Sequence, residues 1–200
     1  MGKVKVKKND TFIDMTPMSD VMTLLLTFFM LTSTFVKNEP VKVNTPGSVS
    51  ETKVPENGVL TILVSPEKGP TGKPTGEGQV FLSYDNTNEL GQIVDNMGIT
   101  LTPAQKKTFV AESTFGTPLD KLAAYLSKPA AERSKELPKM GIPLDSIQGQ
   151  EMTEFQQWVN AARQVNPKVR LAIKSDADSP YGTVKKVMSE LQDMDESHYY

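Results

Sequence analysis

The stretch that organises this chain is Ile13-Asp14-Met15-Thr16-Pro17-Met18-Ser19-Asp20, followed by the apolar run from Val21 to Val36. As an α-helix, residues 15–36 would rise roughly 33 Å, which is enough to cross a bilayer core with some tilt. Asp20 is the one ionisable side chain within those residues. A carboxylate at the centre of a spanning helix costs roughly 2.5–3.5 kcal/mol on insertion scales. The sequence therefore predicts a single membrane-spanning helix over 13–36 whose acidic residue needs a functional reason.

The charges that flank this span predict its orientation. Four lysines lie in residues 1–12, whereas the lysines that follow the span are interleaved with Glu39. The positive-inside rule places 1–12 in the cytoplasm and residues 37–200 across the membrane. A cleaved signal peptide has the same order of basic and apolar residues. Here the apolar core is long, carries an acid and lacks a clear small-x-small cleavage site, so we interpret it as an uncleaved anchor.

Polar side chains of the span fall on one helical face. The residues Thr16, Asp20, Thr23, Thr27 and Thr34 are separated by four, three, four and seven positions, a spacing that keeps them aligned. Such a face serves either as a packing stripe that lets helices approach closely, or as a hydrated path open to protons. Because Asp20 lies in line with the threonines, we favour the hydrated face.

The start of the span and its chemistry follow from the same residues. Thr16 can cap a helix, and Pro17 at the first helical position loses no hydrogen bond. In a low dielectric a carboxyl group favours its neutral form, so Asp20 could bind a proton and release it when its surroundings change. One helix with one acid cannot enclose a pathway, so a partner membrane protein is required. No cofactor other than protons is expected.

Composition and the polar remainder exclude several function classes. The net charge of −2 gives no reason to expect nucleic acid as a partner, and without cysteine there is neither a disulfide framework nor a Cys-based metal site. No nucleophile–base pair or metal cluster follows the span, so we do not expect an enzyme. Asp176 and Asp178 suit a turn better than a metal site. The single histidine, His198, is no metal site either.

Residues 37–58 read as an extended linker because three prolines are spread among small polar residues. The segment 41–44 alternates and could pair as a short strand, and the two interpretations stay open. Beyond the linker the sequence predicts three strands, at 59–64, 79–84 and 168–174, with a long flexible hairpin loop at 67–78.

Helices are predicted after the second and third strands. Cap and proline signals open helices at Thr102-Pro103 and Thr117-Pro118, and we expect Ser179 to cap a helix that Pro180 opens. Two further helices are predicted over 88–97 and 152–165, the second from its apolar spacing. We interpret 99–150 as a helical and loop insertion.

Two blocks of the chain resemble one known family. The stretch from Ile13 to Met22, and the later strand followed by Asp176 and Pro180-Tyr181-Gly182, are similar to the ExbD/TolR proteins, small subunits of proton-driven motors in Gram-negative bacteria. The segment from Val43 to Pro46 also resembles one that often follows the membrane helix in that family.

The resemblance implies specific roles and partners. Asp20 would match the family's essential membrane aspartate, on a helix paired with that of a second copy inside the ring of an ExbB/TolQ-like polytopic subunit. The domain would be periplasmic, anchored in the lipid of the inner membrane, and would pass work to a TonB-like protein. The family fold closes with a strand after its last helix, whereas this sequence reaches only Tyr199 and Tyr200. That strand either only begins here or is missing from the sequence.

Taken together, the sequence predicts an α+β protein in four parts. These are a cytoplasmic tail (1–12), a transmembrane helix (13–36), a linker (37–58) and a periplasmic domain (59–200) whose sheet carries helices on one face. The predicted function is conversion of proton motive force into mechanical work for outer-membrane transport. The alternatives are a TolR-like subunit in envelope maintenance, and an anchored binding module in which Asp20 only assists helix assembly.

Overall fold

A computed structural model describes residues 15–32, 41, 43–45, 58–68, 74–145, 152–196 and 198–200. The chain divides into two compact units, Met1–Asn38 and Glu39–Tyr200. The described part of the first unit is one helix, α1 (Thr16–Thr32), so the two ends of the predicted 13–36 span lie outside the described residues. Among the described residues, no helix is both long enough and apolar enough to cross a membrane.

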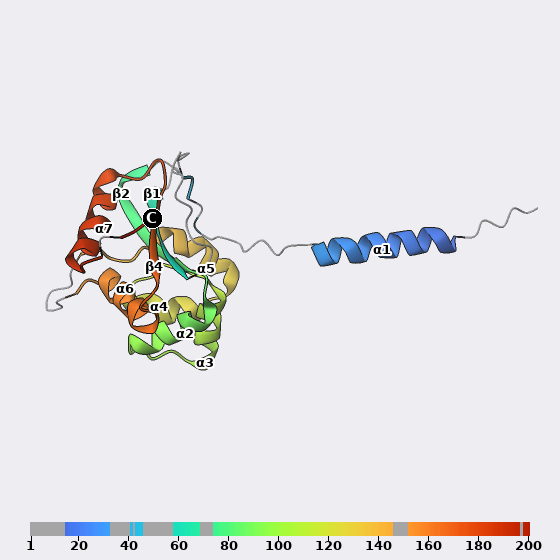
Figure 1. The fold of residues 1–200 in the computed structure, drawn as a ribbon, viewed down its shortest axis with the longest axis horizontal. Coiled ribbons are helices and arrows are strands. Elements are labelled where there is room, and N and C mark those ends of the chain that lie inside the picture. Colours follow the sequence, from blue (N-terminus) through green and yellow to red (C-terminus); the bar gives the residue numbers. More distant parts are fainter. Residues whose placement is uncertain are drawn as a thin grey trace, which may run out of the picture. The chain divides into compact units, whose positions relative to one another are not determined.

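The second unit combines a small sheet with several helices, which confirms the α+β prediction (Figure 1). Its elements in chain order are β1 (Val59–Lys68), β2 (Pro74–Tyr84), α2 (Thr87–Asn96), α3 (Pro103–Ala111), β3 (Thr114–Phe115), α4 (Leu119–Leu126), α5 (Ala130–Glu136), the 3₁₀ helix η1 (Leu137–Lys139), α6 (Glu154–Val165), β4 (Arg170–Ser175) and α7 (Tyr181–Asp193).

The sheet has the strand order β3-β2-β1-β4. β1 and β2 form an antiparallel hairpin, β4 runs parallel to β1, and β3 adds an antiparallel edge beside β2. The three predicted strands are confirmed, but the hairpin is longer than predicted. Pairing continues past Pro66 to Lys68 opposite Pro74, so the predicted flexible loop at 67–78 is wrong over most of its length. The register shifts between Pro66 and Glu67, an irregularity of the kind at which a strand tolerates proline.

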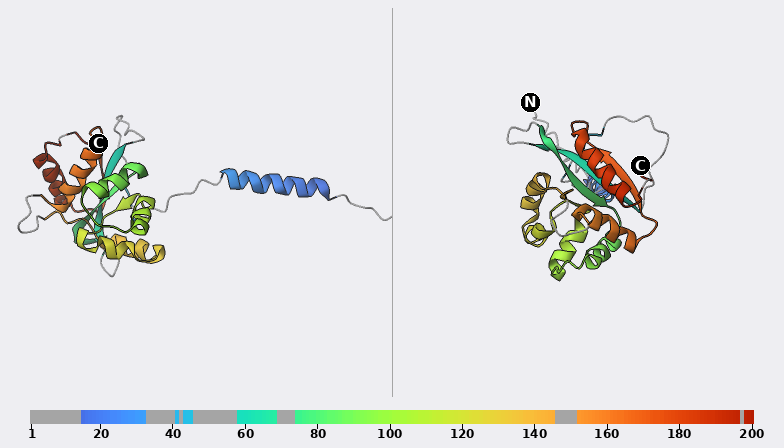
Figure 2. Two further views of the ribbon diagram at one scale, coloured as in Figure 1. Left: turned by 90° about the horizontal axis from the view of Figure 1, so that it is seen from below. Right: turned by 90° about the vertical axis from the view of Figure 1, so that its left-hand side faces the viewer.

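One face of the sheet carries the main core. Alternate residues of the three long strands point to this face, because side chains of a strand alternate. They meet the buried sides of α2, α6 and α7, and α2 also packs against α3 and α6 (Figure 2). The strand residues of this face that are buried are Leu60, Ile62, Val64, Val80, Leu82, Tyr84 and Leu171. Burial of this apolar surface is the main stabilising term of the domain.

The predicted start of α3 is confirmed, whereas α4, α6 and α7 each begin later than predicted. Reciprocal capping boxes join Thr102 to Gln105 and Thr153 to Gln156, at the starts of α3 and α6. α4 begins one residue later than the Thr-Pro signal predicts, with Pro118 in the cap position and without a side-chain cap from that residue. At α7 the predicted cap is also wrong: the Ser179 hydroxyl donates to the Val64 carbonyl oxygen at 2.9 Å instead.

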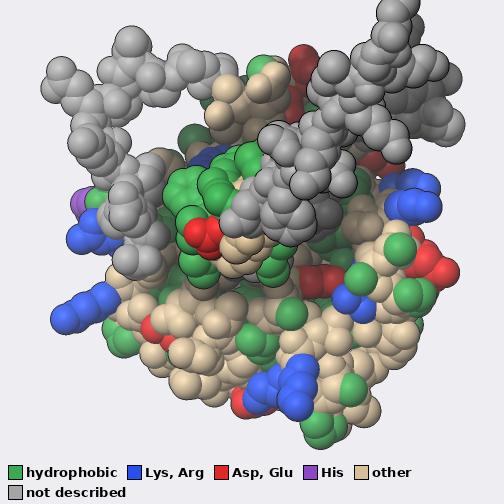
Figure 3. All heavy atoms as spheres, turned by 90° about the vertical axis from the view of Figure 1, so that its right-hand side faces the viewer, with side chains coloured by type: hydrophobic (Ala, Val, Ile, Leu, Met, Phe, Trp, Pro, Cys, Tyr) green, Lys and Arg blue, Asp and Glu red, His purple; other side chains and the backbone are tan. Residues whose placement is uncertain are grey.

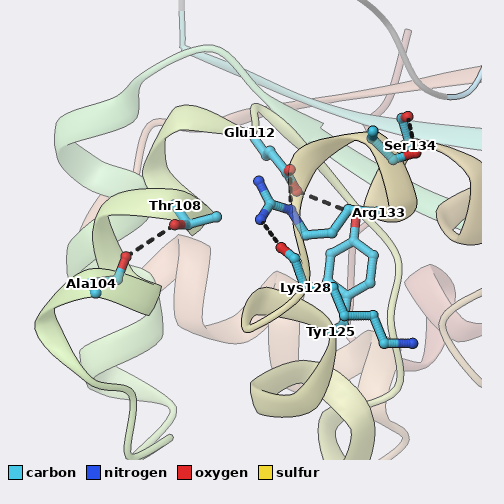
Figure 4. A network of polar contacts seen from close by, with 8 residues as sticks. Ala104, Thr108, Glu112, Tyr125, Lys128, Arg133 and Ser134 are labelled. Carbon is cyan, nitrogen blue, oxygen red and sulfur yellow. Dashed lines mark hydrogen bonds and ion pairs between the residues drawn. The ribbon is translucent and has the colours of Figure 1, made fainter.

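The predicted insertion, 99–150, is attached to the sheet in a way that its sequence does not indicate. It contributes β3, which pairs with β2 at Ser83 and Leu82. A polar cluster then ties α5 back to the end of α3 (Figure 4). In it the Arg133 Nε atom donates to Glu112 Oε1 at 2.7 Å, and the Tyr125 hydroxyl donates to the other oxygen of Glu112. Burial, with Glu112 beside it, raises the pKa of the Tyr125 hydroxyl well above its ordinary range.

The C-terminal residues lie along the outer edge of the sheet. Tyr199 makes a parallel bridge with Leu171 of β4. The Tyr200 amide donates to the Leu171 carbonyl oxygen, and the Ile173 amide donates to the Tyr200 carbonyl oxygen. These residues therefore pair with β4 through an isolated bridge and two hydrogen bonds, after the last helix, where the resemblance implied a closing strand.

Gly116 is the position where the domain should tolerate least added volume. A Cβ atom built on this buried glycine would lie 2.2 Å from the Phe81 ring. We expect Gly116→Ala to lower the free energy of unfolding by about 1–3 kcal/mol, the usual cost of overpacking. Gly182→Ala is the matched control, since nothing lies within 4 Å of a Cβ atom there. Denaturant unfolding measures both, and equal stability of the two variants would contradict this packing.

Candidate functional site

Asp20 lies on α1 within an exposed surface that is otherwise mostly apolar. Helical spacing places it on the same side as Thr16, Thr23 and Thr27; the fifth predicted member of this face, Thr34, lies outside the described residues. Hydrophobic side chains dominate the rest of the helix surface (Figure 3). The exposed large apolar residues, each 49–87 % exposed, are Met18, Val21, Met22, Leu24, Leu25, Leu26, Phe28, Phe29, Met30 and Leu31.

The threonine hydroxyls bond to the helix that carries them. Thr23 Oγ1 donates to the Ser19 carbonyl oxygen at 2.8 Å, and Thr27 Oγ1 donates to the Thr23 carbonyl oxygen at 3.0 Å. Because a hydroxyl has one hydrogen and two lone pairs, each remains able to accept a hydrogen bond. The face therefore offers acceptors beside the Asp20 carboxyl group. A role for it in a proton path stays a prediction.

A second feature joins the linker to the domain. The Asn44 amide donates to Asp176 Oδ2 at 3.0 Å, and the Asn44 carbonyl oxygen accepts from the Ala177 amide at 3.1 Å. Val41 is buried against the core. The described part of the linker is therefore attached to the loop after β4, and a cavity of about 250 Å³ separates it from part of the second face of the sheet.

The two segments that make this contact were each predicted from the sequence, but their pairing was not. The sequence predicts that residues 41–44 are either a tether or a short strand, and that Asp176 is part of a turn. The turn is confirmed, because Asp176 Oδ1 accepts from the Asp178 amide at 3.1 Å. The pairing of Asn44 with Asp176 spans 132 positions of the chain, and no local pattern indicates it.

The burial of one acid, Glu154, was not predicted from the sequence. Glu154 is only 2 % exposed, and its carboxylate accepts from the Leu119 amide at 3.0 Å. Glu154 thereby accepts a hydrogen bond at the start of α4, which the side chain of Pro118 in the cap position cannot do. Burial raises the pKa of the Glu154 carboxyl; the Leu119 amide opposes this, and the nearby charge of Asp120 adds to it. The helix-capping position of Glu154 indicates a structural role.

Comparison with known proteins identifies the class of this chain. The family model of the biopolymer transport protein ExbD/TolR matches residues 6–197, so the chain belongs to the ExbD/TolR family. It is also similar to biopolymer transport protein ExbD2 of Vibrio cholerae, with 29 % identity over 65 residues, 32 % of this chain and 48 % of that protein. The chain thus spans about half the length of the curated relative it matches. No solved structure matches it.

The contact between Asn44 and Asp176 can be tested by amide hydrogen exchange. We expect Asp176→Ala to speed exchange of the Asn44 amide about tenfold or more, since a hydrogen bond to a charged group contributes roughly 1.5–3 kcal/mol. Asp178→Ala is the matched control, because its exposed side chain lies two positions along the same turn. If both variants leave the exchange unchanged, the linker is not held by Asp176.

The buried Glu154 predicts a pH dependence of stability. A carboxyl whose pKa is raised by folding favours the folded state below its unfolded pKa, near 4.3, and loses that contribution as the pH rises through the raised value. Glu154→Gln keeps an acceptor for the Leu119 amide but does not titrate. We therefore expect the unfolding free energy of the wild type, relative to Glu154→Gln, to fall from pH 4 toward neutrality. Parallel pH profiles from denaturant unfolding would contradict this.

Proposed function

We propose that this protein is an energy-transducing subunit of the inner membrane. In this proposal residues 13–36 form the anchor, 1–12 lie in the cytoplasm, and the domain lies in the periplasm. The observation that carries the proposal is Asp20, the one acidic side chain of α1, set among exposed apolar residues. Family membership, over residues 6–197, supports it.

The proposed mechanism begins with the cost of a charge in lipid. A neutral carboxyl group is tolerated in an apolar surrounding, and a charged one requires a polar neighbour. Protonation of Asp20 from one side and release to the other would change which partner surface α1 prefers. Moving one charge through the membrane potential yields about 2.3 kcal/mol per 100 mV. An ExbB/TolQ-like polytopic subunit would supply the surrounding ring, with a second copy of this chain beside the first.

The domain would receive this motion through the linker. Asn44 is bonded to Asp176, and residues 33–43 connect it to α1 in the sequence. A displacement of the helix would therefore reach the loop between β4 and α7. We propose that the domain passes the work to a TonB-like protein that serves outer-membrane transport. The similarity to an ExbD2 protein of Vibrio cholerae favours this role over TolR-like envelope maintenance.

The test compares Asp20→Asn with Asp20→Glu in cells that carry the polytopic partner. Asparagine keeps hydrogen bonding but cannot titrate, so we expect loss of energy-dependent uptake to background. Glutamate still titrates and should keep part of the activity. Val21→Leu, a neighbouring apolar exchange, controls for packing. Full uptake by Asp20→Asn would overturn the motor and favour an assembly contact.

A further inference from the structure

A groove of about 630 Å³ lies between the predicted insertion and the first turn of α7. Its walls are the far end of the β1–β2 hairpin, the start of α4, residues 139–145 and α7. Its size falls in the range of about 300–1,000 Å³ that is usual for ligand sites. Neither Asp20 nor the linker contributes to it.

The groove carries cationic side chains from three different elements. Lys186 of α7 is paired with Asp145 at 3.4 Å. Lys121 of α4 and Lys139 of η1 are exposed and make no ion pair with any described residue. Because Glu67 also lines the groove, the three lysines exceed the two acids there by one positive charge, an excess that favours an anionic occupant.

The side of the groove formed by the hairpin contains an unsatisfied polar group. Gln79 Oε1 is buried and has no hydrogen-bond partner among the residues that the structure describes. Glycines bring the surrounding backbone close: a Cβ atom on Gly141 would lie 3.1 Å from Gln79, and one on Gly78 would lie 2.6 Å from the Thr183 hydroxyl oxygen. A buried side-chain amide normally has a partner. The Gln79 side chain lines the groove, so an occupant with both N–H and C=O groups, such as a peptide main chain, suits the polar character of this wall in either orientation of the amide.

Much of the remaining lining is apolar, although Glu67 and Thr183 also line the groove. Met140 and Leu144 are partly buried against the core, and Ile142 is buried, with its amide bonded to the Val80 carbonyl oxygen at 2.9 Å. A small inorganic anion would leave this surface and Gln79 without contacts. An extended peptide uses all three features together, because it presents acidic side chains, main-chain polar groups and apolar side chains along one strand.

We propose that this groove binds an extended segment of a partner protein that carries acidic side chains next to apolar ones. The carboxylates would lie against Lys121 and Lys139, and the main chain against Gln79. The insertion thereby acquires a function, docking, that goes beyond the proposed proton chemistry and does not depend on it.

The experiment measures binding by fluorescence anisotropy, with the full chain in mild detergent. The probe is a short fluorescein-labelled peptide that alternates glutamate with leucine and proline, and a second peptide has glutamine in place of every glutamate. We expect Lys121→Gln and Lys139→Gln each to weaken binding of the acidic peptide about threefold, and both together about tenfold. Gly182→Leu should block binding, because its Cβ position is open and lines the groove.

Matched controls separate the groove from general attraction. Lys107→Gln removes an exposed lysine of α3, and Ser189→Leu adds an apolar side chain on an exposed position of α7; neither residue lines the groove, so both should bind as the wild type does. Asp20→Asn should also bind normally. Equal binding of the two peptides, unchanged binding in the double lysine variant or in Gly182→Leu, or an equal loss in Lys107→Gln would overturn the proposal. Full displacement of the peptide by an equimolar amount of inorganic phosphate would overturn it as well.

Discussion

The free energy of placing a carboxylate among apolar groups is the constraint on which the proposed function depends. α1 presents large apolar side chains on most of its surface and a single acid, Asp20. Transfer of this apolar surface out of water lowers the free energy. Transfer of the acid with it is tolerated only when the carboxyl group is neutral or meets a polar neighbour. In the proposed function, the protonation state and the packing of the helix are coupled, because both conditions depend on the surroundings. That coupling is what a motor subunit requires.

In the domain, the linker, the sheet and α7 are connected to one another. Its sheet is buried on one face by helices, and the linker is bonded to the loop that follows β4. The same loop leads into α7, whose first turn lines the groove beside the insertion. A pull on Asn44 would therefore be exerted next to the proposed docking groove. Hydrogen bonds to Asp176 are of modest strength, so the connection can transmit force and can also release.

Local patterns predicted most of the elements. The cap signal at Thr102, and runs of β-branched and apolar residues in the strands, determine structure through near neighbours, and these predictions were confirmed. The capping box at Thr153 was not predicted. The predictions failed where the local structure depends on a residue that is distant in the sequence. The Leu119 amide at the start of α4 donates to Glu154, which lies 35 positions away, and the two-residue strand β3 is too short to show alternation. The Asn44–Asp176 contact was not predicted for the same reason, because its two residues are 132 positions apart. Asp20 is predicted from sequence because an acid in an apolar helix is rare, and its role stays a prediction.

The central claim is that the Asp20 carboxyl group changes its protonation state within the assembled complex. Infrared difference spectroscopy of the complex in lipid, with Asp20→Asn subtracted, measures this directly. The account predicts a protonated carboxyl band from Asp20 that is replaced by a carboxylate band when the pH is raised on one side of the membrane. A carboxylate band that stays constant under every condition would contradict it.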